Sequence, residues 1–259
     1  LVCTDTEKTV SESMNKNYIS IAADVLAGDV VNIFEDRDLV SAPVVDKNNI
    51  LLGRITIDDV VDVIREESEH TVLNMAGLTD EEDLFAPILS STRRRAIWLG
   101  LNLITALIAS GVISLFQDTI EKVVALAVLM PIVASMGGIA GSQTLTLVIR
   151  GIALGNISSA NSKSLLIKEV SVGLLNSLLW ASVIGVLSSY WFNNYLIGVV
   201  IGVAMVANLA FAALSGVLIP IVLKKLGVDP ALGGGVILTT ITDVIGFFSF
   251  LTLGTIFLL

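Results

Sequence analysis

The stretch GGGVILTTITDVIGFFSFLTLGTIFLL, residues 233–259, is long and apolar enough to cross a membrane as one helix, yet it carries a carboxylate near its centre. On insertion scales an aspartate in the middle of a span costs about 2.5 to 3.5 kcal/mol. A charged side chain there is by default a functional residue. Asp243 is therefore the first candidate site residue, and we expect it to be the lone carboxylate of the spans, without a basic partner.

The composition indicates a membrane protein with a soluble part. Of 259 residues, 54% are hydrophobic and 15% charged, with a mean hydropathy of +0.86, which is too apolar for a soluble domain of this size. Residues 1–92 hold 6 lysines and arginines against 19 aspartates and glutamates, whereas residues 93–259 hold 9 against 5. The two parts therefore meet different solvents, and the acidic part disfavours nucleic-acid binding.

Five apolar runs of about 20 residues or more predict five transmembrane helices. They lie at about 96–116, 123–149, 165–190, 196–223 and 231–259. Basic residues gather at alternate connectors, which predicts a multi-pass protein of the cell (inner) membrane with a cytosolic N-terminal part and Leu259 outside. These residues are Arg93, Arg94, Arg95, Arg150, Lys163, Lys168, Lys224 and Lys225, with only Lys122 on the other side.

The chain begins at Leu1 without an initiator methionine, a basic start or the apolar core of a signal peptide. We interpret it as a fragment that lacks an N-terminal part. With one histidine, no nucleophile–base pair and no phosphate-binding loop, the sequence gives little support for an enzyme.

The soluble part is predicted to be α/β. A helical pattern runs from Ala22 to Phe34, short strands follow at 41–46 and 50–56 around a turn, and a helix runs over 57–69. The segment SAPVVDKNNILLGRITIDDVVDVI, residues 41–64, resembles the second half of a CBS domain. The resemblance implies a CBS module over 1–65, with the tail of a first copy at 1–9 and a second copy at 10–65, and copies of this domain normally pair.

Thr56 and Asp59 are similar to the residues by which paired CBS domains often hold adenine nucleotides, with the hydroxyl near phosphate and the carboxylate near ribose. The alternative, which we favour, is that Thr56 caps the following helix while Asp58 and Asp59 occupy its first turn, where carboxylates are favourable.

An acidic face follows on the same helix. Acidic residues recur at steps of three and four, where like charges each cost a helix about 0.2 to 0.5 kcal/mol, and Arg65 relieves only part of this repulsion. One interpretation is a solvated face; the other is a regulatory surface that binds Mg²⁺ largely through water. The regulatory residues would be Asp59, Asp62, Glu66, Glu67 and Glu69, continued by Asp80, Glu81, Glu82 and Asp83.

Four segments resemble the MgtE family of magnesium channels and transporters. They are EESEHTVLNMAGLTDEEDLFAPILSSTRRRAIWLG (66–100), PIVASMGGIAGSQTLTLVIRGIALG (131–155), KEVSVGLLNS (168–177) and KKLGVDPALGGGVILTTITDVIGF (224–247). The resemblance implies an α-helical membrane domain of five spans over 93–259, preceded by the cytosolic α/β CBS module and an acidic connecting (plug-like) helix over 66–92.

In that family the aspartate matching Asp243 binds the cation at the centre of a pore, which a homodimer forms mainly from the second and fifth spans. Helical spacing places polar and small residues on one face of each of these spans. These are Gly235, Thr239, Thr242, Asp243, Gly246 and Ser249 on the fifth span, and Pro131, Ser135, Gly138, Ser142 and Thr146 on the second. For Gly137 and Gly141 we favour helix packing alone.

The predicted function is Mg²⁺ transport through this pore, closed by cytosolic Mg²⁺ that binds the acidic region. The chain departs from the family at Ile139, Ser142 and Gly235, where amides or an Asn-Pro pair are usual, and this leaves the selected ion open. Two other functions also stay open: a Na⁺- or H⁺-coupled divalent cation transporter, and a CBS membrane sensor that transports nothing.

Overall fold

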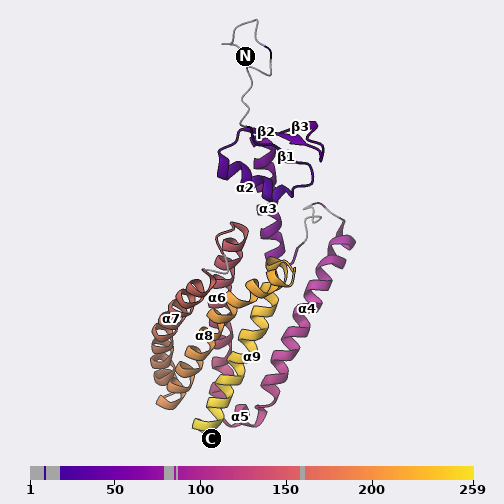
Figure 1. The fold of residues 1–259 in the computed structure, drawn as a ribbon. Helices are drawn as coiled ribbons and strands as arrows, with labels where there is room; N and C mark the ends of the chain where they lie inside the picture. The colour runs from indigo at the N-terminus through magenta and orange to yellow at the C-terminus, as the bar shows by residue number, and fades with distance from the viewer. Residues whose placement is uncertain (1–8, 10–17, 79–84, 86, 158–160) are drawn as a thin grey trace. The chain divides into compact units, whose positions relative to one another are not determined.

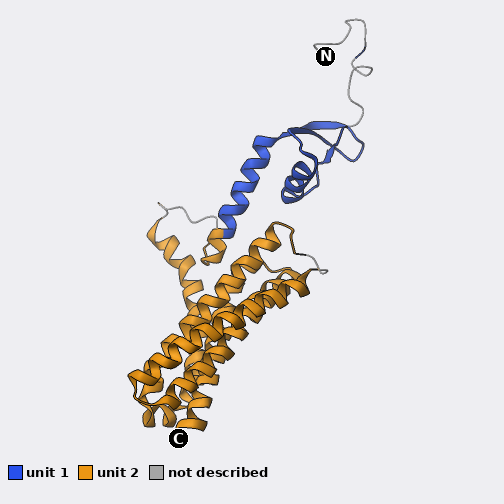
Figure 2. Ribbon diagram, turned by 90° about the vertical axis from the view of Figure 1, so that its left-hand side faces the viewer, with its two compact units in different colours: residues 1–71 blue, residues 72–259 orange. Residues whose placement is uncertain are grey.

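The structure is a computed structural model that describes residue 9, residues 18–78, residue 85, residues 87–157 and residues 161–259. The acidic residues Asp80–Asp83 and most of the predicted first-copy tail lie outside the described residues. The chain divides into two compact units, residues 1–71 and 72–259 (Figure 2).

Unit 1 contains a three-stranded sheet in the order β1 (Ile21–Ala22), β2 (Ser41–Val45) and β3 (Leu51–Thr56). The β1 strand is parallel to β2, with Ile21 opposite Val44, and β2 is antiparallel to β3. The prediction that a helix starts near Ala22 is wrong, because Ile21 is buried in the core and its strand pairs with β2. The α2 helix (Ala27–Arg37) begins only after Leu26.

The predicted turn between β2 and β3 is confirmed, and Asp46 organises it. Its Oδ1 accepts hydrogen bonds from the backbone N–H groups of Asn48 and Ile50, both at 2.8 Å. The bond from Ile50 is the main cause that lowers the pKa of Asp46 below its ordinary value. Asn49 takes a positive φ of 61°, which asparagine tolerates better than most residues.

The acidic segment 66–92 is not one helix. Residues 66–75 complete α3 (Ile57–Met75), which runs from unit 1 into unit 2, and the next helix begins at Ile88. Gly77, at φ 71°, ends α3: its N–H bonds to the Asn74 carbonyl and the Leu78 N–H bonds to the Leu73 carbonyl. This is a Schellman cap, which closes a helix with glycine in the left-handed region. The three-part division of the chain at 65 and 92 stays a prediction.

Unit 2 contains the five predicted apolar helices, each long enough to cross a membrane. They are α4 (Ile88–Ser114), α6 (Val124–Ala153), α7 (Ser162–Trp191), α8 (Tyr195–Lys225) and α9 (Pro230–Leu258), with the short α5 (Gln117–Lys122) between the first two. The prediction of five spans is confirmed.

The α8 helix is the central span of unit 2 (Figure 1). It packs against α6, α7 and α9, and α6 also packs against α9. The contact between α6 and α9 alternates glycine with leucine, because Gly141 faces Leu238 and Gly234 faces Leu145. By contrast, α4 packs mainly against α9, and Ala109 is its one buried residue.

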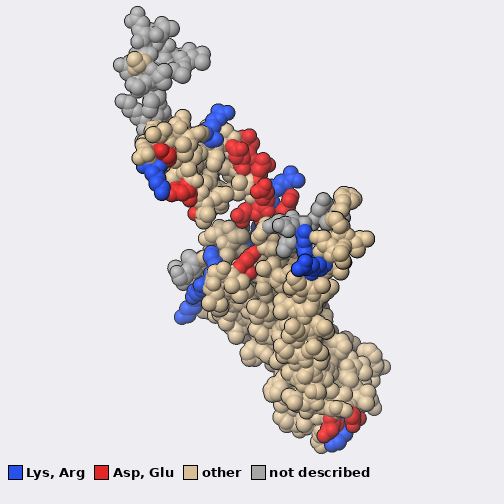
Figure 3. All heavy atoms as spheres, turned by 90° about the vertical axis from the view of Figure 1, so that its right-hand side faces the viewer, with Lys and Arg blue, Asp and Glu red and all other residues tan. Residues whose placement is uncertain are grey.

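Charged side chains on the visible face of unit 2 gather toward its two ends (Figure 3). The middle of this surface is uncharged over most of the length of the long helices, which is what the hydrocarbon core of a bilayer requires. Many large apolar side chains of α4 and α7 are exposed on the surface of unit 2, among them Leu107 at 62% and Val186 at 71%. Unit 2 is therefore built to face lipid.

Candidate cation site

Two neighbouring lines of residues run along α9, and they have different surroundings. Gly234, Leu238, Thr242 and Gly246 follow one another at steps of four and are all buried. Gly235, Thr239 and Asp243 form the next line, which is partly or fully exposed. The predicted single face of α9 is therefore wrong, because Thr242 and Gly246 belong to the packed line.

Asp243 stands on the open line at mid-helix. It is partly exposed, and no salt bridge joins it to another residue in the described part of the chain. A carboxylate held in a span without a basic partner attracts a cation strongly, since the surroundings screen charge poorly. Its position fits a cation-binding residue.

Thr239 and Gly235 lie one and two turns before Asp243 on the same line. The Thr239 hydroxyl donates to the Gly235 carbonyl at 3.0 Å, so its own oxygen can still accept from a water. A Cβ built on Gly235 would meet no other atom within 4 Å. This stretch of α9 therefore presents oxygen atoms and open space rather than apolar side chains.

The α6 helix carries a second polar surface. Its pocket is lined by Gly138, Ile139, Ser142, Gln143, Thr146 and Leu147. The predicted Gly138 and Ser142 thus line the same pocket. Ser135 does not line it and is exposed nearly one turn before Gly138. The pocket lining contains no residue of α9. Gly137 and Gly141 are buried against Asn208 and Leu238, so the prediction that they serve packing is confirmed.

A second carboxylate lies inside the predicted spans, so the expectation that Asp243 is the lone one is wrong. Glu169 of α7 is 5% exposed. Its Oε2 accepts a long hydrogen bond of 3.5 Å from the Thr144 hydroxyl of α6, and its Oε1 lies 3.3 Å from the Lys168 ammonium group. The adjacent Lys168 and Glu169, both within the run 165–190, were the signal in the sequence that could have revealed it.

The proposed regulatory carboxylates Asp59, Asp62, Glu66, Glu67 and Glu69 are all exposed on α3. Arg65 forms an ion pair with Glu69, at 3.1 Å. Among the described residues, no three histidine, cysteine, aspartate or glutamate side chains come close enough to hold a metal ion. Binding of Mg²⁺ through its water shell, which needs no such cluster, stays a prediction.

Thr56 and Asp59 bind each other at the start of α3. One carboxylate oxygen of Asp59 accepts from both the backbone N–H and the hydroxyl of Thr56, each at 2.8 Å. The backbone bond is the main cause that lowers the pKa of Asp59 below its ordinary value, and the hydroxyl bond adds to it. The carboxylate thus reaches back to the helix start as in a capping box. Adenine nucleotide binding at these residues stays a prediction.

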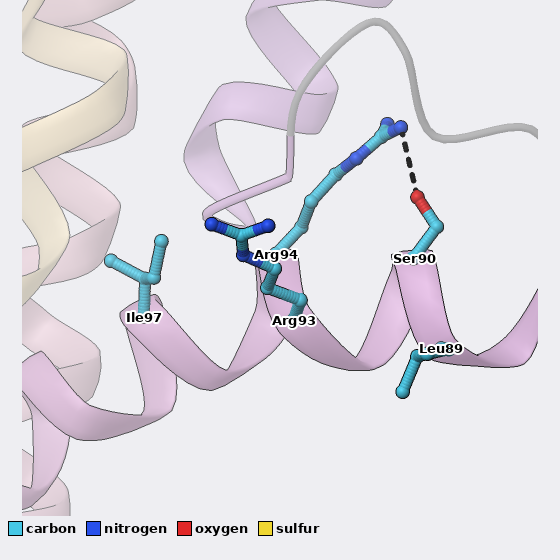
Figure 4. A pocket seen from close by; sticks show the side chains of 5 residues that line it. All are labelled: Leu89, Ser90, Arg93, Arg94 and Ile97. Carbon is cyan, nitrogen blue, oxygen red and sulfur yellow. Dashed lines mark hydrogen bonds between the residues drawn. The ribbon is translucent and has the colours of Figure 1, made fainter.

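The first turns of α4 form a further pocket, lined by Leu89, Ser90, Arg93, Arg94 and Ile97 (Figure 4). Arg94 donates to the Ser90 hydroxyl at 3.3 Å. Basic side chains beside exposed apolar ones are typical of a helix end at the surface of a membrane.

The end of α3 is joined to the start of α9 within unit 2. The Asn74 amide donates to Oδ2 of Asp229 at 2.7 Å, while Oδ1 of the same carboxylate caps α9 by accepting from Ala231 N–H at 2.9 Å. Nearby in sequence, Gly77 lies against the ring of Trp98 on α4. The segment that follows the acidic face therefore bonds directly to the helix that carries Asp243.

These features define a multi-pass membrane protein that carries a partly exposed carboxylate in the middle of one span. The family model described as "MgtE: Divalent cation transporter" matches residues 130–253, and the CBS domain model matches residues 9–66. The chain therefore carries an MgtE family domain in its membrane part and a CBS domain before it.

Three curated relatives match across the whole chain, and each is named magnesium transporter MgtE. The relative from Bacillus subtilis (strain 168) is 31% identical over 258 residues, and the chain covers 57% of it. The relative from Thermus thermophilus is 32% identical and 58% covered, and the relative from Enterococcus faecalis is 29% identical and 57% covered. The chain thus spans a little over half the length of these relatives.

Proposed function

We propose that this chain carries Mg²⁺ across the cell membrane along a path bordered by α6 and α9, with Asp243 as its central cation-binding residue. The observation that carries the proposal is the open line of α9, on which Asp243, Thr239 and Gly235 lie without a basic partner among the described residues. The printed name of the three relatives, magnesium transporter, supports the choice of ion.

The chemistry of this surface suits a hydrated ion. Mg²⁺ prefers oxygen ligands and gives up its water reluctantly, so a path lined by hydroxyls and carbonyls would contact it through that water. Ser142 and Ile139 line the α6 pocket. The positions at which the chain departs from the family pattern therefore lie where a passing ion would meet them, so Mn²⁺, Co²⁺ and Ca²⁺ belong in any test of selectivity.

Two copies of the chain complete the path. Within one chain the buried line of α9 serves packing against α6 and α8, and the line of Asp243 points elsewhere. A homodimer would cover the two open lines around one axis, so that two carboxylates share one divalent ion. The exposed apolar residues of α4 leave further surface for a second copy or for lipid.

The basic residues at alternate connectors support an orientation with unit 1 in the cytosol and the C-terminal end of α9 outside. In this orientation the acidic face of α3 meets cytosolic Mg²⁺. Bound Mg²⁺ would offset the repulsion among these carboxylates and favour a closed arrangement, and its loss would favour an open one. The bond of Asn74 to Asp229 supplies a direct link from α3 to α9.

One observation favours a second function, coupled transport. The buried Glu169 gives the spans another carboxylate besides Asp243, and intramembrane acids of this kind serve as Na⁺ or proton sites in coupled transporters. A sensor that transports nothing would have no use for Asp243. We propose transport rather than catalysis.

The test is divalent cation flux into liposomes that contain the purified protein, with a Mg²⁺-sensitive dye inside. We expect Asp243→Asn and Asp243→Ala to reduce Mg²⁺ flux to the level of empty liposomes, because the carboxylate charge is lost. Asp118→Asn, which changes an exposed carboxylate on α5, is the matched control and should conduct normally. Normal flux through both Asp243 variants would refute the site, and flux that requires a Na⁺ or proton gradient would establish coupled transport.

A further inference from the structure

Asn208, on α8, is a fully buried amide in the most apolar part of the protein. It is 0% exposed, and its Nδ2 donates to the carbonyl of Val133 on α6 at 2.8 Å. That carbonyl lies one turn before Gly137. A side-chain bond to the backbone therefore links α8 to α6 in the middle of the bundle.

Two helices present a glycine to this one amide. A Cβ built on Gly137 of α6 would overlap the Asn208 side chain, and a Cβ on Gly246 of α9 would lie 2.7 Å from its Nδ2. Side chains larger than glycine would thus push either helix away from the amide. Asn208 fills the gap between the two backbones, so its size sets how closely α6 and α9 approach each other.

An asparagine at this buried position would be energetically unfavourable if packing were its only role. Within the described part of the chain its Oδ1 is buried without a hydrogen-bond partner. A buried polar atom left unpaired is unfavourable, and an apolar residue of similar volume would avoid that cost. The directed bond from Nδ2 to the backbone of α6 is what an asparagine supplies and an apolar residue cannot.

The residues beside these contacts belong to the surface proposed above for the cation. Gly138 directly follows Gly137, and a Cβ built on it would meet open space within 4 Å. Asp243 lies three residues, slightly less than one turn, before Gly246. A shift of either backbone at Asn208 would therefore move the proposed lining of the path.

We propose that Asn208 is a positioning residue that fixes the spacing between α6 and α9 and so sets which divalent cation passes. The inference rests on the proposed function. A spacing that suits Mg²⁺ with its tightly held water would handle Ca²⁺ differently, since Ca²⁺ is larger, accepts more ligands and tolerates irregular geometry. Asn208 touches no ion in this scheme, and it acts through the two backbones.

The test compares Mg²⁺ and Ca²⁺ flux through the same liposomes for the wild type and Asn208→Leu, which puts two methyl groups in place of the amide oxygen and nitrogen and so removes the bond to Val133. We expect the ratio of Mg²⁺ to Ca²⁺ flux to change about 3- to 20-fold, the range that corresponds to one interhelical hydrogen bond in a membrane. Ser188→Ala is the matched control: it removes a different buried side-chain oxygen that has no partner in the described chain, the Ser188 hydroxyl on α7, and should keep the wild-type ratio.

Gly246→Ala serves as a second variant if Asn208→Leu does not assemble, because its new methyl group presses on the same amide from α9 and should also change the ratio. An unchanged ratio in the variant that assembles overturns the inference, even where total flux falls, since that pattern shows a purely structural role. A wild type that conducts neither ion refutes the proposed function itself, which distinguishes the two failures.

Discussion

At the scale of single residues, Asp59 shows how a local contact sets the chemistry of a surface. Its carboxylate accepts two hydrogen bonds from Thr56, and these hold the pKa of Asp59 below the ordinary value of 3.8. A lowered folded-state pKa means that the unfolded chain binds the proton first as the pH falls. The contact therefore stabilises the start of α3 above pH 3.8, and this contribution is lost as the pH falls through the lower folded-state pKa.

We expect Asp59→Asn to remove this acid sensitivity, because the amide oxygen can still accept from Thr56 but does not titrate. The measurement is amide hydrogen-exchange protection in the first turn of α3 between pH 6 and pH 3, corrected for intrinsic rates. Wild-type protection should decline toward the acid end and the variant should stay flat. Equal decline in both proteins would show that Asp59 is not the titrating group.

At the residue level the sequence singles out a charge that stands alone in its apolar run, but it gives no signal for polar residues that other helices enclose. Asp243 can be singled out from the sequence because no basic residue in its own span offsets the charge of its carboxylate. Asn208 gives no such signal, since its role depends on Gly137 and Gly246 of two other helices. Glu169 lies beside Lys168 near the start of the predicted span 165–190, and the sequence alone does not show that α6 encloses its carboxylate.

At the scale of helices, glycine contacts decide how closely the spans pack. A Cβ on Gly216 of α8 would lie 2.9 Å from both the Gly141 carbonyl oxygen and the Thr144 Cβ of α6. Neither atom can rotate away, because one belongs to the backbone and the other is fixed to it. The surface of α6 therefore fits α8 only where α8 has no side chain.

We expect Gly216→Ala to destabilise the protein by about 1 to 3 kcal/mol, as overpacking does. Gly111→Ala on α4 is the control, because a Cβ there would meet no other atom within 4 Å. The readout is the temperature at which the detergent-solubilised protein loses its monodisperse peak on size-exclusion chromatography. Equal temperatures for the two variants would contradict the packing argument.

The number of spans and their approximate limits could be predicted from apolar runs, but their faces could not. A helical wheel puts Thr242 and Asp243 toward opposite ends of one polar arc, and only the structure shows that Thr242 is packed while Asp243 stays partly exposed. The residue at which α3 ends could not be predicted from the sequence either. Acidic residues continue past Met75 in the sequence, and only the cap at Gly77 shows that the helix stops.

At the scale of the whole molecule, α3 carries both the acidic face and Asn74, which lies next to its last residue. We expect Mg²⁺ to protect the segment 76–87 from protease in the wild type. Replacing Glu66, Glu67 and Glu69 by Gln should weaken that protection, because fewer carboxylates remain to hold the ion. The measurement is the Mg²⁺ concentration for half-protection. If that concentration is unchanged, the sensing groups lie elsewhere in the protein.

Asp229 uses both of its carboxylate oxygens, one to begin α9 and one to hold Asn74. The membrane unit therefore starts earlier than hydropathy suggests, at residue 72 rather than at the first span. A shortened protein cut at Ile88 would keep all five apolar helices, yet leave Oδ2 of Asp229 without its amide and Trp98 without Gly77. Anyone trimming this chain for spectroscopy or crystals should retain that last turn of α3 as part of the bundle.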